Sequence, residues 1–413
     1  MSSGKNSRYR FPNRLMLLLN RGLGWLIRSC VPYRVRLAIR EAWFRRHLSG
    51  FAAPSGNQRL SAAEFDRARF ICRDIRAVIA GRLRYIEANG LDPGFCLPGA
   101  IWKGDWENST LYRGTAALLR EDYDVLNNLR LFSQVFTGYS LVEMNDARGI
   151  VSPDRVPPDL AERQLQASRH IDEWIVRYWR LSRSLPESLH ISQPNRFGES
   201  GWIFNGRIVN HDTYVYLERI ALLYESGLLE RLGGGSSGKN PLILEIGGGF
   251  GGLAYHLKRL VPRGRFILID LPESLAFSAI YLSTLFPDQR NVLATSPESI
   301  TRDLDQPGFT FVPNHFCHRF EASGIRVDLA INTLSMSEMA ASQVRTYCAL
   351  IRKCLAPEGS FFEQNQDNRH LGLLNAEDLV AEFFASRRRL TLPVVLACGS
   401  PNLWTGVRNS DSR

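Results

Sequence analysis

Apolar residues recur at intervals of three and four over long segments in the first part of the chain, between about residue 60 and residue 232. This is the period of an amphipathic helix, which buries one face and leaves the other in water. The pattern predicts helices over 61–88, 110–136, 159–185 and 213–232. Asn210 and Asp212 are both placed to cap the last of these, because short polar side chains accept hydrogen bonds from the first amides of a helix.

Beyond residue 240 the pattern changes to short apolar runs separated by helical segments. The runs predict strands over 241–246, 265–270, 309–313, 327–332, 360–365, 392–397 and 402–408. Helices are expected between them, including segments at about 337–354 and 376–388. Strands that alternate with helices indicate an α/β fold with a doubly wound, mostly parallel sheet. Ligands of such sheets bind at the carboxyl ends of the strands.

A Gly- and Ser-rich segment, GGGSSGKN, separates the two patterns and has the composition of a flexible connector. The length of 413 residues also exceeds that of one ordinary domain. We therefore predict a basic leader over 1–50, a mainly helical acceptor or cap domain over 51–232, the connector over 233–240, and an α/β domain over 241–413.

The positive charge of the chain is concentrated in the leader. Residues 1–50 hold eleven Lys or Arg residues and one acidic residue, so they account for the whole formal charge of +10. The rest of the chain is formally neutral. This disfavours a nucleic-acid partner, because following a phosphate backbone needs a net basic face.

Within the leader, Arg14, Arg21 and Arg28 recur every seven residues among Leu and Trp residues, so they share one face of a helix. The uncharged runs are shorter than the ~20 residues needed to span a membrane. A basic amphipathic helix is typical of attachment to an anionic membrane surface, and we expect a cytoplasmic protein whose leader acts at the inner membrane face. A solvated leader, a helix docked on the body, and a transit peptide are the alternatives.

The seven cysteines are scattered and contain no C-x-x-C pair, which predicts a reducing compartment without a disulfide framework. His315, Cys317 and His318 lie close together in NHFCHRF, but no second cluster at ligand spacing accompanies them. We therefore predict no metal site, and nothing in the sequence indicates a divalent cation.

The stretch LEIGGGFGGLA, residues 244–254, holds five glycines in six positions directly after a predicted strand. It fits the dinucleotide pattern G-x-G-x-x-G from Gly247, and it also fits an acidic-x-G-x-G-x-G pattern from Glu245 to Gly251. Both patterns place a turn without side chains against a nucleoside. Both use Asp270, at the end of the next strand, to accept hydrogen bonds from ribose hydroxyls. The loop alone does not distinguish them.

The end of the chain does distinguish them. The predicted strands 392–397 and 402–408 form a hairpin after five earlier strands, which resembles the Rossmann-like, seven-stranded sheet of class I S-adenosylmethionine methyltransferases and leaves no segment for a dehydrogenase substrate domain. The blocks LEIGGGFGGLAYHLKRL, FILIDLPES and VDLAINTLSMSEM are similar to those of the sugar O-methyltransferases found with polysaccharide and natural-product glycosylation genes. The resemblance covers roughly residues 195–408 and weakens through the helical half.

This resemblance implies S-adenosylmethionine as the cofactor and a saccharide hydroxyl as the methyl acceptor. It assigns Gly247, Gly249 and Gly251 to the turn against the methionine part of the cofactor, where any Cβ would crowd the ligand. The alternative is that these glycines serve only a tight strand-to-helix turn. It places Glu245 opposite the cofactor's ammonium group. As a plain strand-end residue, Glu245 would be an unexplained buried charge.

Two further polar positions are assigned to the cofactor on the same basis. Asp270 would bind the ribose, although the Leu-Pro-Glu that follows it also suits the start of a helix. Asn332 ends a strand and carries an amide suited to hydroxyl groups, as do Gln364 and Asn365. These amides could instead satisfy loop backbone.

A sugar hydroxyl is a poor nucleophile, so a general base is expected, and three residues are candidates. Glu338 follows the fourth predicted strand, where this fold keeps acceptor chemistry, but Ser335-x-x-Glu338 is also a capping box. His315 follows the third strand and could contact adenine, act as the base, or lie in a surface loop. His211 stands beside a helix cap, after a loop that resembles the family's acceptor-side segment.

Two weaker signals concern the acceptor. Trp102, Trp106 and Tyr112 could form an aromatic platform for a sugar ring or simply pack in a core. The Arg387–Arg389 run ends a predicted helix and could accept a phosphate-bearing saccharide, or merely oppose the helix dipole.

Three other functions fit parts of the sequence. An O-methyltransferase of a lipid or aromatic natural product would keep the same fold. A catalytically silent methyltransferase fold could act as a scaffold for glycan-assembly enzymes. The presence of Glu245, Asp270 and an intact glycine loop argues against this alternative, because a scaffold does not need all three. A dehydrogenase is the remaining alternative, and binding of nicotinamide nucleotides would separate it from the others.

Overall fold

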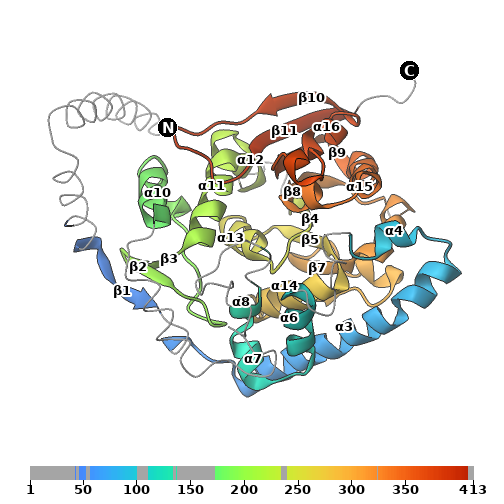
Figure 1. The fold of residues 1–413 in the computed structure, drawn as a ribbon, viewed down its shortest axis with the longest axis horizontal. Helices are drawn as coiled ribbons and strands as arrows, with labels where there is room; N and C mark the ends of the chain where they lie inside the picture. Colours follow the sequence, from blue (N-terminus) through green and yellow to red (C-terminus); the bar gives the residue numbers. More distant parts are fainter. Residues whose placement is uncertain are drawn as a thin grey trace, which may run out of the picture.

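The computed structural model describes residues 42, 46–52, 56–99, 110–133, 136, 173–233, 240–322 and 324–407. The strands of its central sheet are β4 (Leu242–Ile246), β5 (Arg265–Asp270), β6 (Arg290–Leu293), β7 (Gly308–Pro313), β8 (Val327–Thr333), β9 (Leu355–Asn365), β10 (Phe384–Arg389) and β11 (Ser400–Val407). Their spatial order is β10-β11-β9-β8-β4-β5-β7-β6 (Figure 1). The strands from β4 to β9 run parallel, and β11 lies antiparallel between β9 and β10. The predicted α/β class with a mostly parallel sheet is confirmed.

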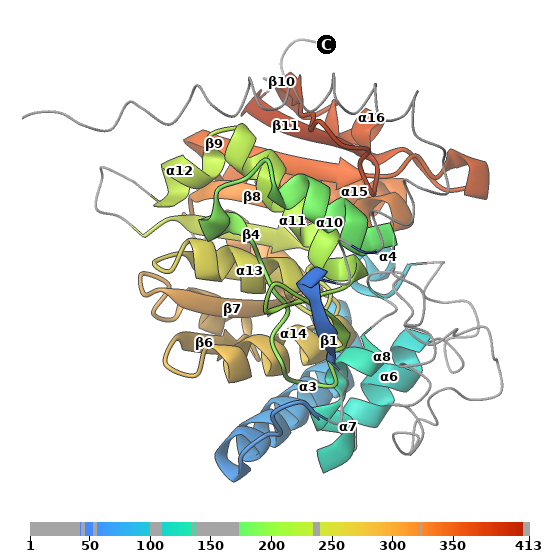
Figure 2. The same cartoon turned by 90° about the vertical axis from the view of Figure 1, so that its left-hand side faces the viewer.

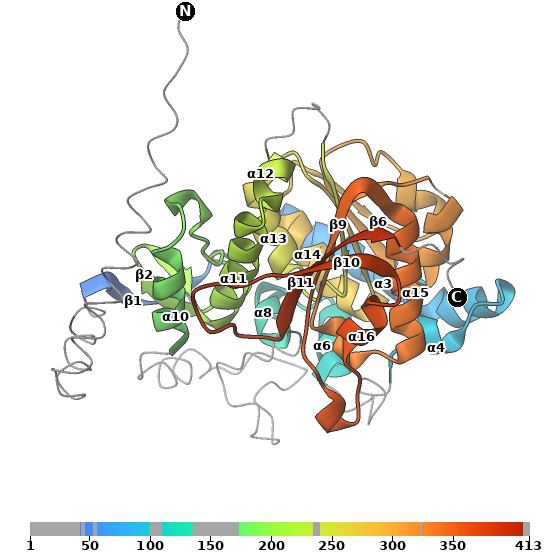
Figure 3. The same cartoon turned by 90° about the horizontal axis from the view of Figure 1, so that it is seen from above.

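Helices cover both faces of this sheet (Figure 3). One face carries α11 (His211–Glu225), α12 (Leu228–Gly233), α13 (Gly252–Leu260) and α14 (Pro272–Leu285), and the other carries α15 (Ala341–Cys354) and α16 (Ala376–Val380). Successive residues of a strand point to opposite faces. In β4, Leu244 and Ile246 therefore pack into the core beneath α15, whereas Ile243 packs into the core beneath α11 and α13. Glu245 points to the same side as Ile243.

Within the described ranges, eight strands belong to the sheet, whereas the sequence led us to expect seven. The additional strand, β6, pairs in parallel with β7 at one edge. At the other edge the strand beside β11 is β10, not the expected segment 392–397. The helix expected over 376–388 is correspondingly short, because α16 ends at Val380 and β10 begins at Phe384.

The segment 392–397 packs against α11 instead of joining the sheet. Pro393 has no amide hydrogen to give to a sheet ladder. The amide of Ala397 donates to the carboxylate of Glu218 in α11 (2.6 Å), so this backbone group is satisfied without a neighbouring strand. The same contact brings Ala397 and Cys398 to the carboxyl ends of the parallel strands.

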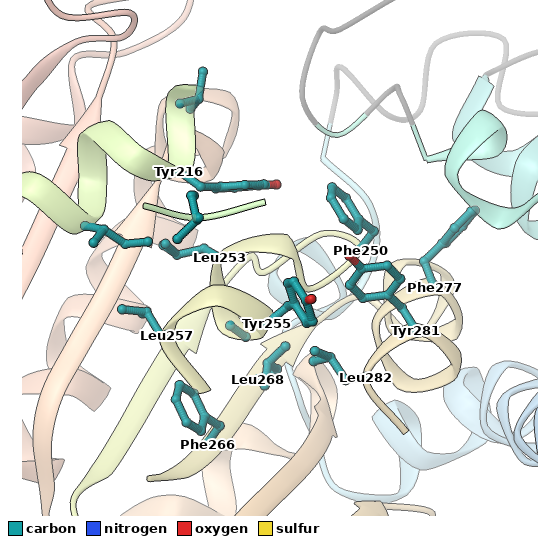
Figure 4. Packing of buried hydrophobic residues seen from close by; sticks show 14 of the residues in the cluster. Tyr216, Phe250, Leu253, Tyr255, Leu257, Phe266, Leu268, Phe277, Tyr281 and Leu282 are labelled. Atoms are coloured by element: carbon teal, nitrogen blue, oxygen red, sulfur yellow. The ribbon is translucent and has the colours of Figure 1, made fainter. Parts of the chain in front are cut away.

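Helix α14 is buried on nearly every side. The sheet covers one side, and α3 (Ala62–Ala88) and α6 (Thr110–Leu119) of the N-terminal half cover the other (Figures 1 and 2). Figure 4 shows Tyr281 and Leu282 of α14 beside Phe250 and Tyr255, which follow β4. One hydrophobic core thus contains residues from both predicted domains. The boundaries proposed for those domains remain a prediction.

The other described elements lie mainly in the N-terminal half and in the connections between strands. They are α4 (Pro93–Cys96), α7 (Tyr123–Asn127), α8 (Leu129–Phe132), α10 (Glu173–Ser182), a three-stranded sheet of β1 (Leu48–Ala52), β2 (Gly201–Phe204) and β3 (Arg207–Val209), and short 3₁₀ segments η4 (Glu187–Leu189), η5 (Pro297–Thr301), η6 (Asn314–Ala322), η7 (Ser335–Glu338) and η8 (Arg369–Leu371).

The structure confirms two of the predicted helix starts. Helix α3 begins after Ser61, whose side chain forms a capping box with Glu64. Helix α11 begins after Asn210, whose side chain accepts from the Thr213 amide (3.0 Å), so Asn210 rather than Asp212 is the cap. The helix expected over 110–136 is broken into α6, α7 and α8.

Most of the leader, most of the connector, Trp102 and Trp106 lie outside the described residues. In the part of the chain that is described, no helix is long and apolar enough to cross a membrane.

A buried ion pair joins the N-terminal half to the α/β half. Arg82 of α3 donates twice to the Glu273 carboxylate at the start of α14 (2.7 and 2.9 Å), and both side chains are buried. Glu273→Gln is expected to lower the free energy of unfolding by about 3–5 kcal/mol, because it leaves the guanidinium buried without a counter-charge. Urea denaturation measures this. Glu382→Gln, which breaks the exposed pair with Arg345, should cost less than about 1 kcal/mol. Equal losses in the two variants would contradict this account.

Candidate active site

The glycine loop connects β4 to α13 with three residues in the left-handed region. Gly247, Gly249 and Gly251 have φ values of 72°, 56° and 87°. A Cβ on Gly251 would lie 2.8 Å from Cδ1 of Leu282, and a Cβ on Gly247 would collide with the side chain of Ser335. Glycine is therefore required at these positions by the turn and by its packing. The bare backbone also opens the carboxyl end of β4.

Two neighbouring cavities lie against this loop. The larger has a volume of about 410 Å³ and extends from the glycine loop to the ends of β5 and β7. The smaller, of about 50 Å³, lies between the loop and α11. The residues that line both are Phe136, His211, Gly247, Gly249, Thr333, Leu334 and Cys398. A ligand that fills both cavities would pass His211 at their junction.

Glu245 lines the smaller cavity. Its carboxylate is buried, and Oε2 has no hydrogen-bond partner among the described residues. Burial raises the pKa of Glu245 to about 7, with Arg219 opposing the shift and Asp270 adding to it. Burying a carboxylate oxygen that has no hydrogen-bond partner costs folding free energy, unless a cation or a hydrogen-bond donor binds it. The smaller cavity therefore offers a carboxylate oxygen without a partner to a cation or donor, although the Arg219 guanidinium also lines it.

Asp270 lines the larger cavity at the end of β5. Its Oδ2 accepts from the Gly249 amide (3.0 Å) and its Oδ1 from the Leu271 amide (2.7 Å). Burial raises its pKa to about 6, against the effect of these amides. Asp270 does not cap α14, whose N-cap is Leu271. It braces the glycine loop, and each oxygen has a further lone pair for a hydroxyl group.

Asn332 lies beneath the glycine loop rather than in a cavity wall. Its Nδ2 donates to the Ile246 carbonyl (2.8 Å) and to Ser335 Oγ (2.6 Å), and its Oδ1 accepts from Asn365 (2.9 Å). These hydrogen bonds agree with the alternative stated above for Asn332, in which its amide supports the backbone of the loop instead of binding the cofactor. Asn332 is not among the residues that line either cavity.

His211 and Glu338 both line the larger cavity. The Nδ1 atom of His211 lies 3.1 Å from Oδ1 of Asp212. The Trp174 ring packs edge-on against the imidazole, with 4.4 Å between the ring centroids. Burial raises the pKa of Glu338. The alternative for Glu338, a capping box with Ser335, is wrong, because these residues form the 3₁₀ segment η7 and α15 begins only at Ala341.

His315 does not line either cavity. Its ring packs against Tyr85 and Phe316, and burial lowers its pKa to about 4, with the charge of Arg82 adding to the effect. The residue before it, Asn314, lines the larger cavity instead. The general-base role predicted for His315 is therefore not supported by its position.

The N-terminal half closes the far end of the larger cavity, which the sequence did not indicate. The Nδ2 atom of Asn314 donates to the Phe95 carbonyl (3.1 Å), and Gln343 Nε2 donates to the Gly94 carbonyl (2.9 Å). Phe95 and Leu97 thereby join the wall of the cavity. Asn314 Oδ1 is buried and has no partner among the described residues, so it can accept a hydrogen bond from a ligand.

The arginine run lies at the edge of the sheet and is paired within the protein. Arg387 and Arg389 lie in β10 rather than at a helix end, and both pair with Glu377 of α16. Arg388 donates to the Ser226 carbonyl (3.1 Å). Across the described residues, no group of three or more His, Cys, Asp or Glu side chains could hold a metal ion.

No protein-family model and no curated protein matches the chain. Among solved structures, it is similar to the N-methyltransferase NodS from Bradyrhizobium japonicum WM9 in complex with S-adenosylhomocysteine, with 17% identity, a TM-score of 0.29, and coverage of 44% of this chain and 84% of that one. It is also similar to human Methyltransferase-like protein 13, again in complex with S-adenosylhomocysteine. The identity is 15%, the TM-score is 0.31, and the coverage is 48% of this chain and 83% of that one.

A third similar structure is the 16S rRNA N2 G1207 methyltransferase RsmC of T. Thermophilus with AdoMet and guanosine, at 16% identity, a TM-score of 0.31, and coverage of 47% and 43%. Similarity at this level identifies neither a family nor an acceptor. The chain's own strand order, with β11 antiparallel between β9 and β10, matches the class I methyltransferase fold with β6 added at one edge.

Proposed function

We propose that this protein is an S-adenosylmethionine-dependent O-methyltransferase that acts on a saccharide hydroxyl. The observation that carries the proposal is the pair of neighbouring cavities at the glycine loop, each lined by a carboxylate, which is buried in Glu245 and half-buried in Asp270. Glu245 in the smaller cavity suits the ammonium of a methionine group, and Asp270 in the larger suits the ribose hydroxyls. Asn314 Oδ1, at the far end, suits an exocyclic amine of adenine.

The positions of Glu245 and Asp270 also set the direction of the ligand. The amino-acid end would lie in the smaller cavity beside α11, and the nucleoside in the larger one. The reacting centre between them would then lie at the junction of the cavities. Of the histidines that the structure describes, His211 is the one that borders both spaces.

When bound, S-adenosylmethionine supplies a methyl group on a positively charged sulfur. The residues of the chain position an acceptor hydroxyl in line with that group and remove its proton, which together account for most of the expected acceleration. We assign the removal of the hydroxyl proton to His211, because this residue lies at the junction of the two cavities, whereas Glu338 borders only the larger one.

A dinucleotide is a poorer fit to the same loop. In dehydrogenases the glycine-rich turn faces a pyrophosphate, whose negative charge favours backbone amides and helix N-termini. Here the turn shares a small cavity with the buried carboxylate of Glu245. An ionised Glu245 would repel a pyrophosphate and attract an ammonium group.

The saccharide acceptor rests on the sequence resemblance, and the surface attachment of residues 1–50 to anionic membranes remains part of the same proposal. Glycan assembly at the inner membrane face would explain a basic amphipathic leader on a formally neutral body. Liposome sedimentation of the protein with and without residues 1–50 tests the leader. Equal sedimentation of both forms would contradict attachment.

Asp270→Ala is expected to weaken binding of S-adenosylhomocysteine by about 10- to 100-fold, because it removes charge-assisted hydrogen bonds to ribose and the brace on the Gly249 amide. Isothermal titration calorimetry measures the change. Glu382→Gln, on an exposed ion pair, is the matched surface control and should bind like the wild type. Unchanged affinity in Asp270→Ala would contradict the placement of the ribose.

Transfer of labelled methyl groups into fractionated cell extracts tests the function itself. Label is expected in a saccharide or glycolipid fraction with the wild type and not with Asp270→Ala. Label in protein or aromatic metabolites would keep the methyltransferase but overturn the sugar. Cofactor binding without labelling of any fraction would favour the scaffold alternative.

A further inference from the structure

A buried charged cluster lies behind His211. Its members are Arg130, Glu199 and Asp212, which are 3%, 2% and 1% exposed, and we call them the Arg130 cluster. The Arg130 guanidinium donates from Nε to Glu199 Oε2 (2.7 Å) and from Nη2 to Asp212 Oδ2 (2.7 Å). The other oxygen of Asp212 lies 3.1 Å from His211 Nδ1. One carboxylate thus joins the buried arginine to the histidine at the junction of the cavities.

Contacts on two sides hold the cluster in place. The loop before β2 reaches α8 through Phe197, whose carbonyl accepts from the Arg130 amide (2.9 Å). Phe197 and Gly198 have φ values of 63° and 74°, and a Cβ on Gly198 would lie 2.8 Å from Asn128 Oδ1. On its other side, the Arg130 guanidinium lies 3.8 Å from the centroid of the Phe250 ring in the glycine loop. The cluster is tied both to the N-terminal half and to the loop that faces the cavities.

In the Arg130 cluster, one guanidinium faces two carboxylates. Burial raises the pKa of Glu199, and the charge of Asp212 adds to that effect. Against the effect of its own burial, hydrogen bonds and charge from His211 and Arg130 lower the pKa of Asp212. The carboxylate that faces His211 is thereby held ionised by the Arg130 guanidinium.

We propose that Asp212 is a positioning residue for His211: it holds the ring hydrogen on Nδ1, so that Nε2 accepts the proton of the acceptor hydroxyl. This inference rests on the proposed function. In the step, the acceptor oxygen bonds to the methyl carbon, the carbon–sulfur bond breaks with its electron pair left on sulfur, and the hydroxyl proton moves to Nε2. Arg130 keeps Asp212 ionised throughout and fixes its carboxylate in one orientation.

Nitrogen-15 NMR of the histidine rings tests this positioning without turnover. The His211 signals are those lost from the spectrum of His211→Gln. In the wild type they are expected to show the Nδ1–H tautomer. Asp212→Asn presents an amide that can donate to Nδ1, so the Nε2–H tautomer is expected in that variant. An Nε2–H tautomer in the wild type would overturn the proposal, even if Asp212→Asn fails to fold.

The kinetic test uses Asp212→Asn alone and combined with His211→Ala. The single change is expected to lower kcat by about 10²-fold, with the Kd for S-adenosylhomocysteine within about threefold of the wild type. In the His211→Ala background it should have no further effect on kcat, because there is no ring to position. Equal effects in the two backgrounds would show a structural role only and would overturn the proposal.

Tyr178→Phe controls for lost stability, since it removes a buried hydroxyl that donates to the Ile191 carbonyl (2.7 Å), and its kcat should stay within about twofold. The two claims fail separately. If the wild type transfers no methyl group to any acceptor, the proposed function fails. The tautomer of His211 still decides whether Asp212 positions the ring.

Discussion

Replacing His211 with alanine is expected to lower kcat for methyl transfer by about 10²- to 10⁴-fold, which is the usual contribution of a positioned general base. The Kd for S-adenosylhomocysteine should stay within about threefold, because the cofactor is assigned to Glu245, Asp270 and the glycine loop. Steady-state kinetics with a saccharide acceptor and calorimetry with S-adenosylhomocysteine measure the two quantities. Added imidazole is expected to restore part of the activity, since it can occupy the space of the lost ring.

His370→Ala is the control for this prediction, because His370 is exposed in η8 and lines neither cavity. Its kcat should match that of the wild type. If His211→Ala keeps wild-type kcat while Glu338→Gln loses it, the base is Glu338 and the assignment to the junction is wrong. If both variants keep activity, positioning alone accounts for the reaction.

Glu245→Gln is expected to act in opposite directions on affinity and on stability. At pH 8 it should weaken binding of S-adenosylhomocysteine by about 10²- to 10³-fold, because a buried charge pair with the ammonium group is lost. The same change should stabilise the ligand-free protein by about 3 kcal/mol, because it removes a carboxylate that is buried with an unsatisfied oxygen. Calorimetric titration and urea denaturation measure the two effects.

The pH dependence of both effects follows from the pKa of Glu245, which burial raises from its ordinary value near 4.5 to about 7. Between these two values the folded protein keeps a proton that the unfolded chain has lost, so folding stability falls as pH rises and levels off above about pH 7. The stabilising effect of Glu245→Gln should therefore vanish below about pH 4.5. Wild-type affinity for the ammonium-bearing ligand should fall as pH drops below about 7, and that of the variant should not.

Glu363→Gln provides a matched comparison in the same sheet. Glu363 is also buried, and burial also raises its pKa, but Asn365 and Asn402 satisfy its oxygens (2.8 and 2.9 Å). It lines neither cavity. Ligand affinity should therefore be unaffected in this variant. A loss of affinity as large as that of Glu245→Gln would mean that the ammonium site has been misplaced.

The parts of the site that could be predicted from the sequence are those encoded by neighbouring residues. The glycines of the loop, Glu245 and Asp270 belong to a strand, a turn and the end of the next strand, and a parallel sheet brings such ends together. The structure places Gly247, Gly249, Glu245 and Asp270 at the cavities, whereas Gly251 lines neither of them and packs against Leu282. His211 was predicted beside a helix cap, and Asn210 does cap α11.

The Arg130 cluster could not be predicted, because its members are 69 and 82 residues apart and meet only in the folded chain. The loop that delivers Glu199 depends on left-handed backbone at Phe197, which the sequence does not signal. The contact between Asn314 and the Phe95 carbonyl could not be predicted either, because the two residues are 219 positions apart in the sequence. Contacts of this kind depend on tertiary packing rather than on a local pattern.

The sheet edge was mispredicted for a different reason. The sequence of β10, FASRRR, lacks the alternation of a half-buried strand, and only Phe384 in it is buried. Alanine and arginine favour a helix. Antiparallel pairing with β11 overrides that preference, and Phe384 packs against Phe361 and Trp404 across the sheet.

A crystal structure of the protein with S-adenosylhomocysteine tests the central claim most directly, because that claim concerns where the two ends of the cofactor lie. We predict the ammonium nitrogen within hydrogen-bond distance of Glu245, the ribose hydroxyls on Asp270, and the sulfur at the junction of the cavities beside His211. A ligand whose amino-acid end lies away from Glu245, or whose sulfur lies out of reach of His211, would contradict the account.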